Sequence, residues 1–500
     1  MTELQSHPNM SQRAMLLRLA KQAMTTRGLE PEFPPAALAE AQMLLAPSAP
    51  FGEGVRDLRD LPWCSIDNDD SRDLDQLSVA LTGEDGSTRV LVAVADVYAS
   101  VTPGTALDAH AAKNTTSVYT APRTFAMLPE RLSTDLTSLG VGVDRLAILI
   151  EIPWGSESPE APAIITRGVV RNHAKLAYAA TGAWLEGRGK EPAAVRAQQG
   201  LAANLRLQDT AAQKLRAWRH AHGALELASL EARVQLEGDK VTGLTIDDRD
   251  RARDLIEDLM IAANGAIARF LVEHRFPVLR RVVRSPERWP RIVDLAVQLG
   301  DTLPAAPDAQ ALHAFLLRRR AADALRFPDL SLSVIKLLGR GTYEASFPGD
   351  DVTGHFGLAV SDYTHSTAPN RRYPDLITQR LVRAALAGEP VPFTREALQA
   401  LAAHCTKQED AAQKIERLLR KAAAACLLEH RVGEEFAGIV TGASAKGTWV
   451  RIFEPPVEGR LESGTDGLDV GDRVHVKLIR TDPERGFIDL ALVSKPAHQV

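Results

Sequence analysis

Apolar residues alternate with polar ones, or gather in short runs, along several early segments of the chain, which predicts β-strands. Leu77, Val79 and Leu81 occupy every second position after a short apolar-leaning segment, residues 61–66. RVLVAVADV and RLAILIEIPW, further along, are rich in valine, isoleucine and leucine. Such residues in runs of this length are typical of strands. Strands therefore dominate the prediction for the first half of residues 51–430.

Helical spacing of apolar residues appears at the N-terminus and again in the second half of the chain. Residues 396–430 are rich in alanine and leucine, with charges on alternate turns, which predicts a long helix. Near the N-terminus, one apolar stripe ends near Gly28, and Pro34 and Pro35 open a second helix over residues 36–45. The stripe consists of Leu16, Leu17, Leu19, Ala20 and Met24.

Residues 1–50 are therefore predicted to form a two-helix module. A helix-turn-helix-like unit that binds RNA is one interpretation, and a helical cap packed on the next domain is the other. No local motif separates the two.

The last part of the chain, residues 431–500, has a different pattern. Short alternating segments are separated by glycine, proline and aspartate, which predicts a small all-β domain. The chain thus divides into three parts: residues 1–50, 51–430 and 431–500.

Composition narrows the class of protein. The chain has 500 residues, of which 45% are hydrophobic and 25% charged, as in ordinary globular proteins. No apolar run reaches the length of a membrane span, and the N-terminus lacks the apolar core of a signal peptide. Three scattered cysteines give neither a disulfide framework nor zinc spacing. We therefore expect a cytoplasmic protein without a membrane partner.

The net charge of −5 is unusual for a protein whose whole surface adsorbs nucleic acid. It suits an enzyme with an acidic metal site and locally placed basic residues, which would hold phosphates in a positive channel.

The most distinctive stretch is the loop between two of the predicted strands. Its nine positions hold five aspartates: Asp67, Asp69, Asp70, Asp73 and Asp75. So many carboxylates would repel one another and raise each other's pKa unless cations lie among them. Oxygen ligands suit Mg²⁺ or Mn²⁺, so the loop is a candidate metal site.

Two other structures compete with a metal site in this loop. A solvated acidic surface loop is the commoner fate of a charge run. An EF-hand calcium loop is excluded, because its sixth and twelfth positions require glycine and a carboxylate but hold Arg72 and Ser78 here.

The acidic loop resembles the signature of the ribonuclease II/ribonuclease R (RNB-domain) exoribonuclease family. Asp67, Asp73 and Asp75 match its first three acidic positions, whereas Gln76 stands at the fourth, which is usually aspartate. Further blocks resemble the family in its own order: VAVADVYASV (92–101), LDAHAAKNTTSVY (107–119), MLPERLSTDLTSL (127–139), LIEDLMIAANGAIA (255–268) and YTHSTAPNRRYPDLITQRL (363–381).

This resemblance implies an α+β fold. Residues 51–430 would form the RNB catalytic domain with a central RNA channel. Residues 431–500 resemble the ribosomal S-one-type OB-fold, a β-barrel that binds single strands by stacking and cationic contacts. Typical family members carry two cold-shock-type domains before the signature, and the roughly 60 residues that precede it here are too few for them.

The resemblance also implies roles for single residues. Asp67, Asp73 and Asp75 would be metal ligands or their immediate neighbours, with Gln76 putting a second metal position in doubt. Arg371 matches the arginine that contacts the scissile phosphate. Asp69 and Asp70 match no family position.

Other positions would bind the RNA strand. Tyr178 matches a tyrosine that stacks on the terminal base, and Leu227 stands where the family has its phenylalanine partner. Asp258 matches an acid that can hydrogen-bond a ribose 2′-hydroxyl. Arg372 and Arg380 would bind neighbouring phosphates. Pairing with Asp375 or Glu257 is the alternative, and it is favoured more for Arg372 than for Arg371. In the barrel the candidates are Phe436, Lys446, Trp449, Arg451, Phe453 and Lys477, of which Phe436 is better explained as core.

The function that these matches imply is a hydrolytic, processive 3′→5′ exoribonuclease. It would act as a monomer on the 3′ end of single-stranded RNA and release 5′-mononucleotides. One alternative is a catalytically compromised RNA-binding regulator, which Gln76 alone favours. A metal-dependent phosphodiesterase that acts on DNA or short oligonucleotides is the third interpretation.

Overall fold

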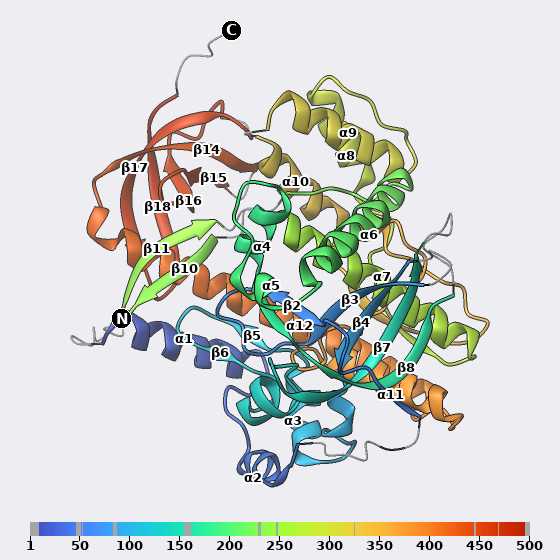
Figure 1. Cartoon of the computed structure of the whole chain (residues 1–500). Helices are drawn as coiled ribbons and strands as arrows, with labels where there is room; N and C mark the ends of the chain where they lie inside the picture. Colours follow the sequence, from blue (N-terminus) through green and yellow to red (C-terminus); the bar gives the residue numbers. More distant parts are fainter. Residues whose placement is uncertain are drawn as a thin grey trace.

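The computed structural model describes residues 10–46, 52, 54–83, 88–154, 162–228, 232–246, 249–324, 326–444, 447–468 and 470–495. Within these ranges a mixed α+β body carries a small β-barrel at one side (Figure 1). The barrel, drawn in red, lies next to the hairpin of β10 and β11 and away from the large sheet. The predicted α+β class and the C-terminal barrel are confirmed.

A mainly antiparallel sheet organises the first half of the chain. Its strand order is β1-β8-β7-β4-β3-β2-β9, with parallel pairs at both edges, β1 with β8 and β2 with β9. The central strands are buried nearly throughout, which explains why their sequences are continuous apolar runs. The strands are β1 (Val55–Asp57), β2 (Cys64–Asp67), β3 (Gln76–Thr82), β4 (Thr88–Ala95), β7 (Asp144–Trp154), β8 (Ile164–Arg171) and β9 (Ala174–Ala177).

Helices and short hairpins from the second half pack around this sheet. Helix α7 contacts β4 and β7, and α6 contacts β3. The α-helices between the N-terminal pair and the barrel are α3 (Ala106–Asn114), α4 (Tyr178–Leu185), α5 (Ala193–Ala197), α6 (Leu201–Ala221), α7 (Arg251–Glu273), α8 (Trp289–Gln298), α9 (Ala309–Ala322), α10 (Phe327–Leu338), α11 (Tyr373–Ala387) and α12 (Arg395–Leu428). The paired strands are β5 (Val118–Tyr119) with β6 (Thr124–Phe125), β10 (Ala232–Glu237) with β11 (Lys240–Ile246), and β12 (Val278–Val282) with β13 (Thr342–Ser346).

Among the helices of the described ranges, none is both long enough and apolar enough to span a membrane.

The long helix α12 connects the body to the barrel. It begins after the capping residue Thr394 and runs for 34 residues, close to the predicted range. At its C-terminal end, Ala424, Ala425 and Leu428 belong to the same apolar cluster as the barrel interior. The barrel closes in the order β14-β15-β16-β18-β17, and Phe436 is only 6% exposed inside it, as predicted. Its strands are β14 (Glu435–Ser444), β15 (Gly447–Ile452), β16 (Val457–Ser463), β17 (Arg473–Asp482) and β18 (Phe487–Ser494).

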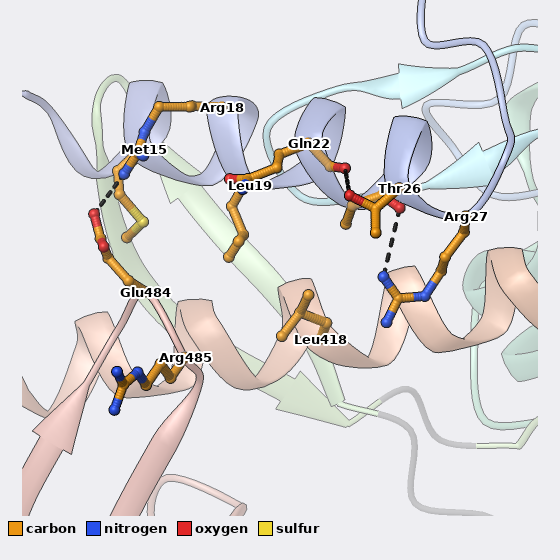
Figure 2. Close-up of a pocket in the computed structure, with 10 residues that line it drawn as sticks. Met15, Arg18, Leu19, Gln22, Thr26, Arg27, Leu418, Glu484 and Arg485 are labelled. Atoms are coloured by element: carbon orange, nitrogen blue, oxygen red, sulfur yellow. Dashed lines mark hydrogen bonds and ion pairs between the residues drawn. The ribbon is translucent and has the colours of Figure 1, made fainter.

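Both predicted N-terminal helices are present, as α1 (Gln12–Thr26) and α2 (Pro35–Met43). The apolar side of α1 is buried against α12, where Leu16 and Met24 join a cluster with Ile415 and Leu419. Figure 2 shows Leu19 on the side of α1 that faces α12, and Arg18 reaching Glu484 in the turn between β17 and β18. This packing favours the helical-cap interpretation over a separate helix-turn-helix unit.

Candidate active site

The acidic loop leaves the sheet at the end of β2 and returns at the start of β3. Its two ends are therefore fixed by the strands, with Asp67 the last residue of β2 and Gln76 the first of β3. The middle is held by Ser138, whose hydroxyl accepts from the Leu74 amide at 3.0 Å and donates to the Arg72 carbonyl at 2.8 Å. The loop is thus a fixed part of the fold and not a solvated tail.

Asp75 is the most buried of the loop's carboxylates, at 3% exposure. Its Oδ1 accepts from the backbone N–H of Asn370 at 3.0 Å, and its Oδ2 accepts from Nε of Arg371 at 3.3 Å. The folded chain therefore brings two motifs together that lie 295 residues apart in sequence.

Two of the loop's carboxylates ionise less readily than usual. Burial raises the pKa of Asp75 to about 7, and the charge of Asp73 adds to this effect. Burial also raises the pKa of Asp73, with a further contribution from Asp67. Such shifts mark a place where added positive charge would be stabilised.

The carboxylates of the acidic loop are suitable ligands for a hard divalent cation, but they do not form a complete coordination shell. Asp67, Asp73 and Asp75 supply oxygen ligands, and the charge of Asp67 acts on Asp73 as that of Asp73 acts on Asp75. Within the described residues, however, no three His, Cys, Asp or Glu side chains converge as a ready-made metal group. Mg²⁺ is commonly held by one or two carboxylates, with water and substrate phosphate completing its shell. That arrangement is the one these residues fit.

The other residues of the loop point to less central roles. Gln76 is half-buried, and its backbone pairs with Val94 of β4. Asp69 and Asp70 are exposed, and Asp70 pairs with Arg233 of β10 at 2.6 Å.

Arg371 is fixed through its backbone by the segment after α3. The Ser117 amide donates to the Arg371 carbonyl at 3.0 Å, and the Tyr373 amide donates to the Thr115 carbonyl at 2.8 Å. Thr115 itself has φ of 59°, a left-handed conformation that β-branched residues rarely adopt. The side chain of Arg371 remains 42% exposed, so its guanidinium can meet a ligand.

Sequence reasoning missed two residues beside Asp75 and Arg371. Asn370 clamps Asp75 through its backbone, and its own side chain accepts from the Thr137 hydroxyl at 2.5 Å. Burial raises the pKa of Tyr119, and the nearby charge of Arg371 opposes this rise. Both residues stand inside motifs that were recognised in the sequence, so the motifs were the available signal, but only the fold showed the contacts.

Arg372 and Arg380 do not reach the site as free cations. The guanidinium of Arg372 makes two hydrogen bonds to Asp375, at 2.7 and 2.9 Å, which is the pairing named as the alternative to phosphate binding. Arg380 is 3% exposed and pairs with Asp108 at 2.6 Å. The predicted phosphate contact of Arg380 therefore does not fit the structure, because its charge is already neutralised in the interior.

Tyr178 lies beside the acidic loop. It follows β9 directly, and β9 pairs with β2 so that Ala177 stands opposite Asp67. The guanidinium of Arg253, on α7, covers the Tyr178 ring at 4.7 Å from the ring centroid. Arg253 is a further residue that the sequence pattern did not indicate.

Leu227 and Asp258 lie in other surroundings. Leu227 packs against the apolar cluster of α8, α9 and α10, and it lines a hollow of about 280 Å³, whereas Tyr178 packs against the core of the sheet. Asp258 is 2% exposed and pairs with Arg219 of α6. Burial raises the pKa of Asp258 to about 6, against the opposing charge of Arg219. A ribose contact by Asp258 would require this ion pair to open, so the structure gives the residue a packing role.

The candidate RNA-binding residues of the barrel lie either on its surface or at its contact with α10. Arg451 pairs with Asp329 of α10 at 3.0 Å, which ties the barrel to the body and does not leave a free cation. Trp449 is half-buried on β15. Phe453 and Lys477 are exposed, whereas Lys446 lies outside the described residues.

A basic hollow lies near this site. Its volume is about 1160 Å³, and it lies between α10, β13 and α12. Tyr343 in its wall is hydrogen-bonded to His365 at 2.8 Å, and His365 lies close to the charges of Arg371 and Arg372. The charged residues that line it are Arg284, Glu287, Arg288, Lys336, Arg340, Glu344 and Arg417.

Comparisons with known proteins agree with this geometry. The sequence model of the RNB domain matches residues 55–388, and that of the RNase II-type exonuclease C-terminal S1 domain matches residues 434–493. A curated protein named Ribonuclease R, from Aquifex aeolicus, is 31% identical over 467 residues, covering 88% of this chain and 65% of that protein. The chain therefore spans less than two thirds of the length of this relative.

Solved structures resemble the fold over nearly the whole chain. Mycoplasma genitalium RNase R in complex with ribose methylated single-stranded RNA matches with a TM-score of 0.85 at 21% identity, over 96% of this chain and 78% of that one. The same protein in complex with double-stranded RNA matches with a TM-score of 0.84 at 22% identity, over 96% and 83%.

Proposed function

This chain belongs to the RNB domain family, and from that membership we propose that it is a metal-dependent 3′→5′ exoribonuclease. It hydrolyses single-stranded RNA from the 3′ end and releases 5′-mononucleotides. The main observation behind the proposal is that Asp73, Asp75 and Arg371 lie together. An acidic cluster thus stands beside an accessible guanidinium.

Each part of this cluster has a task in phosphodiester hydrolysis. Divalent cations, when bound, supply Lewis-acid chemistry that activates water and neutralises phosphate charge. Asp67, Asp73 and Asp75 would hold them. Arg371 donates to the oxygens of the scissile phosphate and meets the charge that develops there. Asp75, behind Arg371, keeps its guanidinium in place.

The strand is held by contacts on either side of the cluster. Tyr178 receives the terminal base on its ring, beside Asp67. In the basic hollow, Arg284 and Arg340 are paired with Glu344 and Asp410. Arg288, Lys336 and Arg417, which also line it, suit the phosphates of the strand that follows. Repeated contacts of this kind would keep the enzyme on one RNA through successive cleavages.

A time course on single-stranded RNA labelled at its 5′ end tests the activity. With Mg²⁺, the label should move progressively to a short 5′ oligonucleotide, and EDTA should stop the reaction. The Asp75→Asn variant should leave the RNA intact, and DNA of the same sequence should be cleaved far more slowly. A parallel series with Mn²⁺ would show which metal serves better.

Other outcomes would contradict the proposal. RNA left intact with both metals, but still bound, would favour a binding protein with a site compromised at Gln76. Equal cleavage of DNA and RNA would favour a general phosphodiesterase. Internal cuts that leave long labelled fragments would exclude an exonuclease.

We further propose that duplexes with a 3′ overhang are substrates, because Mycoplasma genitalium RNase R, whose fold this chain shares, has been solved in complex with double-stranded RNA. The test substrate is a labelled duplex whose 3′ overhang is long enough to reach the site. Progress of the label past the first base pair supports the idea, whereas complete arrest there defeats it.

The proposal includes a monomeric enzyme that works in the cytoplasm. Sedimentation of the purified chain over a range of concentrations would test the first point, and fractionation of cells the second. A concentration-independent mass other than that of one chain would contradict the monomer.

A further inference from the structure

We propose that Arg253 sets how firmly the terminal base of the RNA is held, because it backs the ring of Tyr178 on which that base stacks. This inference rests on the function proposed above. It assigns Arg253 as a positioning residue, which acts through Tyr178 and does not touch the reacting atoms.

The first observation is the stacking of the two side chains. The guanidinium carbon of Arg253 lies 4.7 Å from the centroid of the Tyr178 ring. A cation at this distance is attracted to the face of an aromatic ring. With one face covered by Arg253, the ring is held in one orientation, and stacking of a base is left to its opposite face.

The second observation explains why Arg253 reaches this place. Asp250 caps the start of α7 by accepting from the amides of Ala252 and Arg253, both at 2.9 Å. The same carboxylate lies so close to α4 that a Cβ added at Gly182 would stand 2.7 Å from its Oδ1. Glycine at position 182 therefore lets α7 approach α4. Arg253, one turn after Asp250 on α7, meets Tyr178, one turn before Gly182 on α4.

The third observation connects Arg253 to the acidic loop. Its Nη2 donates to Oδ1 of Asn68 at 3.2 Å, and the Asn68 amide donates to Oδ1 of Asp67 at 2.7 Å. One guanidinium thus contacts both the base platform and the residue next to a proposed metal ligand. Arg253 therefore also ties the base platform to the acidic loop through Asn68.

Leu227 gives this contact added weight. An aliphatic side chain there, packed in another cluster, offers little stacking from the second side of the base. Binding of the terminal base then depends mainly on Tyr178, and therefore on Arg253, which keeps the tyrosine ring in place. The consequence is specific: loss of Arg253 should weaken binding only where a terminal base is present.

Two RNAs that differ only at the 3′ terminus test this. One ends in an ordinary nucleotide and the other in an abasic ribose. With Mg²⁺, Arg253→Gln should raise KM about fivefold on the ordinary RNA, in keeping with the loss of a cation–π contact, and leave kcat nearly unchanged. On the abasic RNA its KM should equal that of the wild type.

Further variants separate the contacts. Arg253→Lys keeps a cation over the ring and should recover part of the loss. Asn68→Ala removes only the loop contact and should not distinguish the two RNAs. Arg188→Gln, at a side chain that is 69% exposed, serves as a surface control and should match the wild type.

An equal rise of KM on both RNAs, or no rise on either, would overturn the role of Arg253. If the wild type hydrolyses no RNA, the proposed function fails separately. The role of Arg253 is then tested by fluorescence anisotropy with the same two labelled RNAs in EDTA. A selective loss of affinity for the ordinary RNA in Arg253→Gln supports the proposal there, and equal affinities overturn it.

Discussion

Nε of Arg371 lies 3.3 Å from Oδ2 of Asp75, although 296 residues separate them in the chain. Their exposures differ sharply, since the side chain of Asp75 is 3% exposed and that of Arg371 is 42% exposed. The buried carboxylate therefore holds the arginine from behind while the guanidinium faces the solvent. Several consequences of this arrangement can be measured.

Replacing Asp75 with asparagine should abolish most of the hydrolysis of RNA. The change keeps the side-chain shape and an acceptor for the Asn370 amide but removes the negative charge. We expect a loss of at least about 100-fold in kcat, as for removal of a group that stabilises charge in a transition state. Rates on 5′-labelled RNA measure the effect. Asp70→Asn is the matched control in the same loop, exposed and paired only at the surface, and should retain activity.

The two arginines of the same motif should respond in opposite ways. Arg371→Lys keeps the positive charge but loses the planar fork, so kcat should fall about tenfold while the free energy of unfolding changes little. Arg380→Gln leaves Asp108 buried without its partner and should cost about 3–5 kcal/mol of stability.

Urea unfolding and steady-state kinetics, measured on both variants, would test this contrast. The folded fraction of Arg380→Gln should keep the salt dependence of RNA binding seen in the wild type. A weaker salt dependence in that variant would instead mean that Arg380 contacts a phosphate.

His355 should make the stability of the protein depend on pH. Burial, with the nearby charge of Arg281, lowers the pKa of His355 to about 4. Because the unfolded chain takes up the proton first, stability is fully present above about pH 6.5 and is lost as pH falls toward 4. We expect a loss of about 2 kcal/mol from this group, allowing for its partial exposure.

His355→Asn offers a test, since the asparagine Oδ1 can still accept from the Leu358 amide, as Nδ1 of His355 does at 3.1 Å. The difference in unfolding free energy between wild type and variant should shrink as pH falls from 7 to 4. A difference that stays constant over this range would contradict the assignment.

Leu16→Ala should destabilise the chain by about 2–5 kcal/mol, because this residue is fully buried between α1 and α12. Leu38→Ala, at a site that is 43% exposed, should change stability by less than about 0.5 kcal/mol. Urea unfolding compares the two. Loss of RNA affinity without loss of stability in Leu16→Ala would instead favour an RNA-binding role for α1.

Local sequence patterns were sufficient to predict several helices, the strands of the barrel and the family. Helical spacing located α1, α2 and α12, and alternation located the barrel strands, because each period follows from the local geometry of the backbone. The acidic loop could be recognised for a similar reason: its aspartates are close in sequence, so their mutual repulsion is visible without a fold.

Tertiary structure alone decided which charges are free. Asp75 and Arg371 meet across 296 residues, whereas Arg380 and Arg451, which look equally available in the sequence, are neutralised by Asp108 and Asp329. The contact of Arg253 with Tyr178 depends on how closely α7 packs on α4. Burial and ion pairing are set by neighbours that are distant in the chain, and therefore no local pattern encodes them.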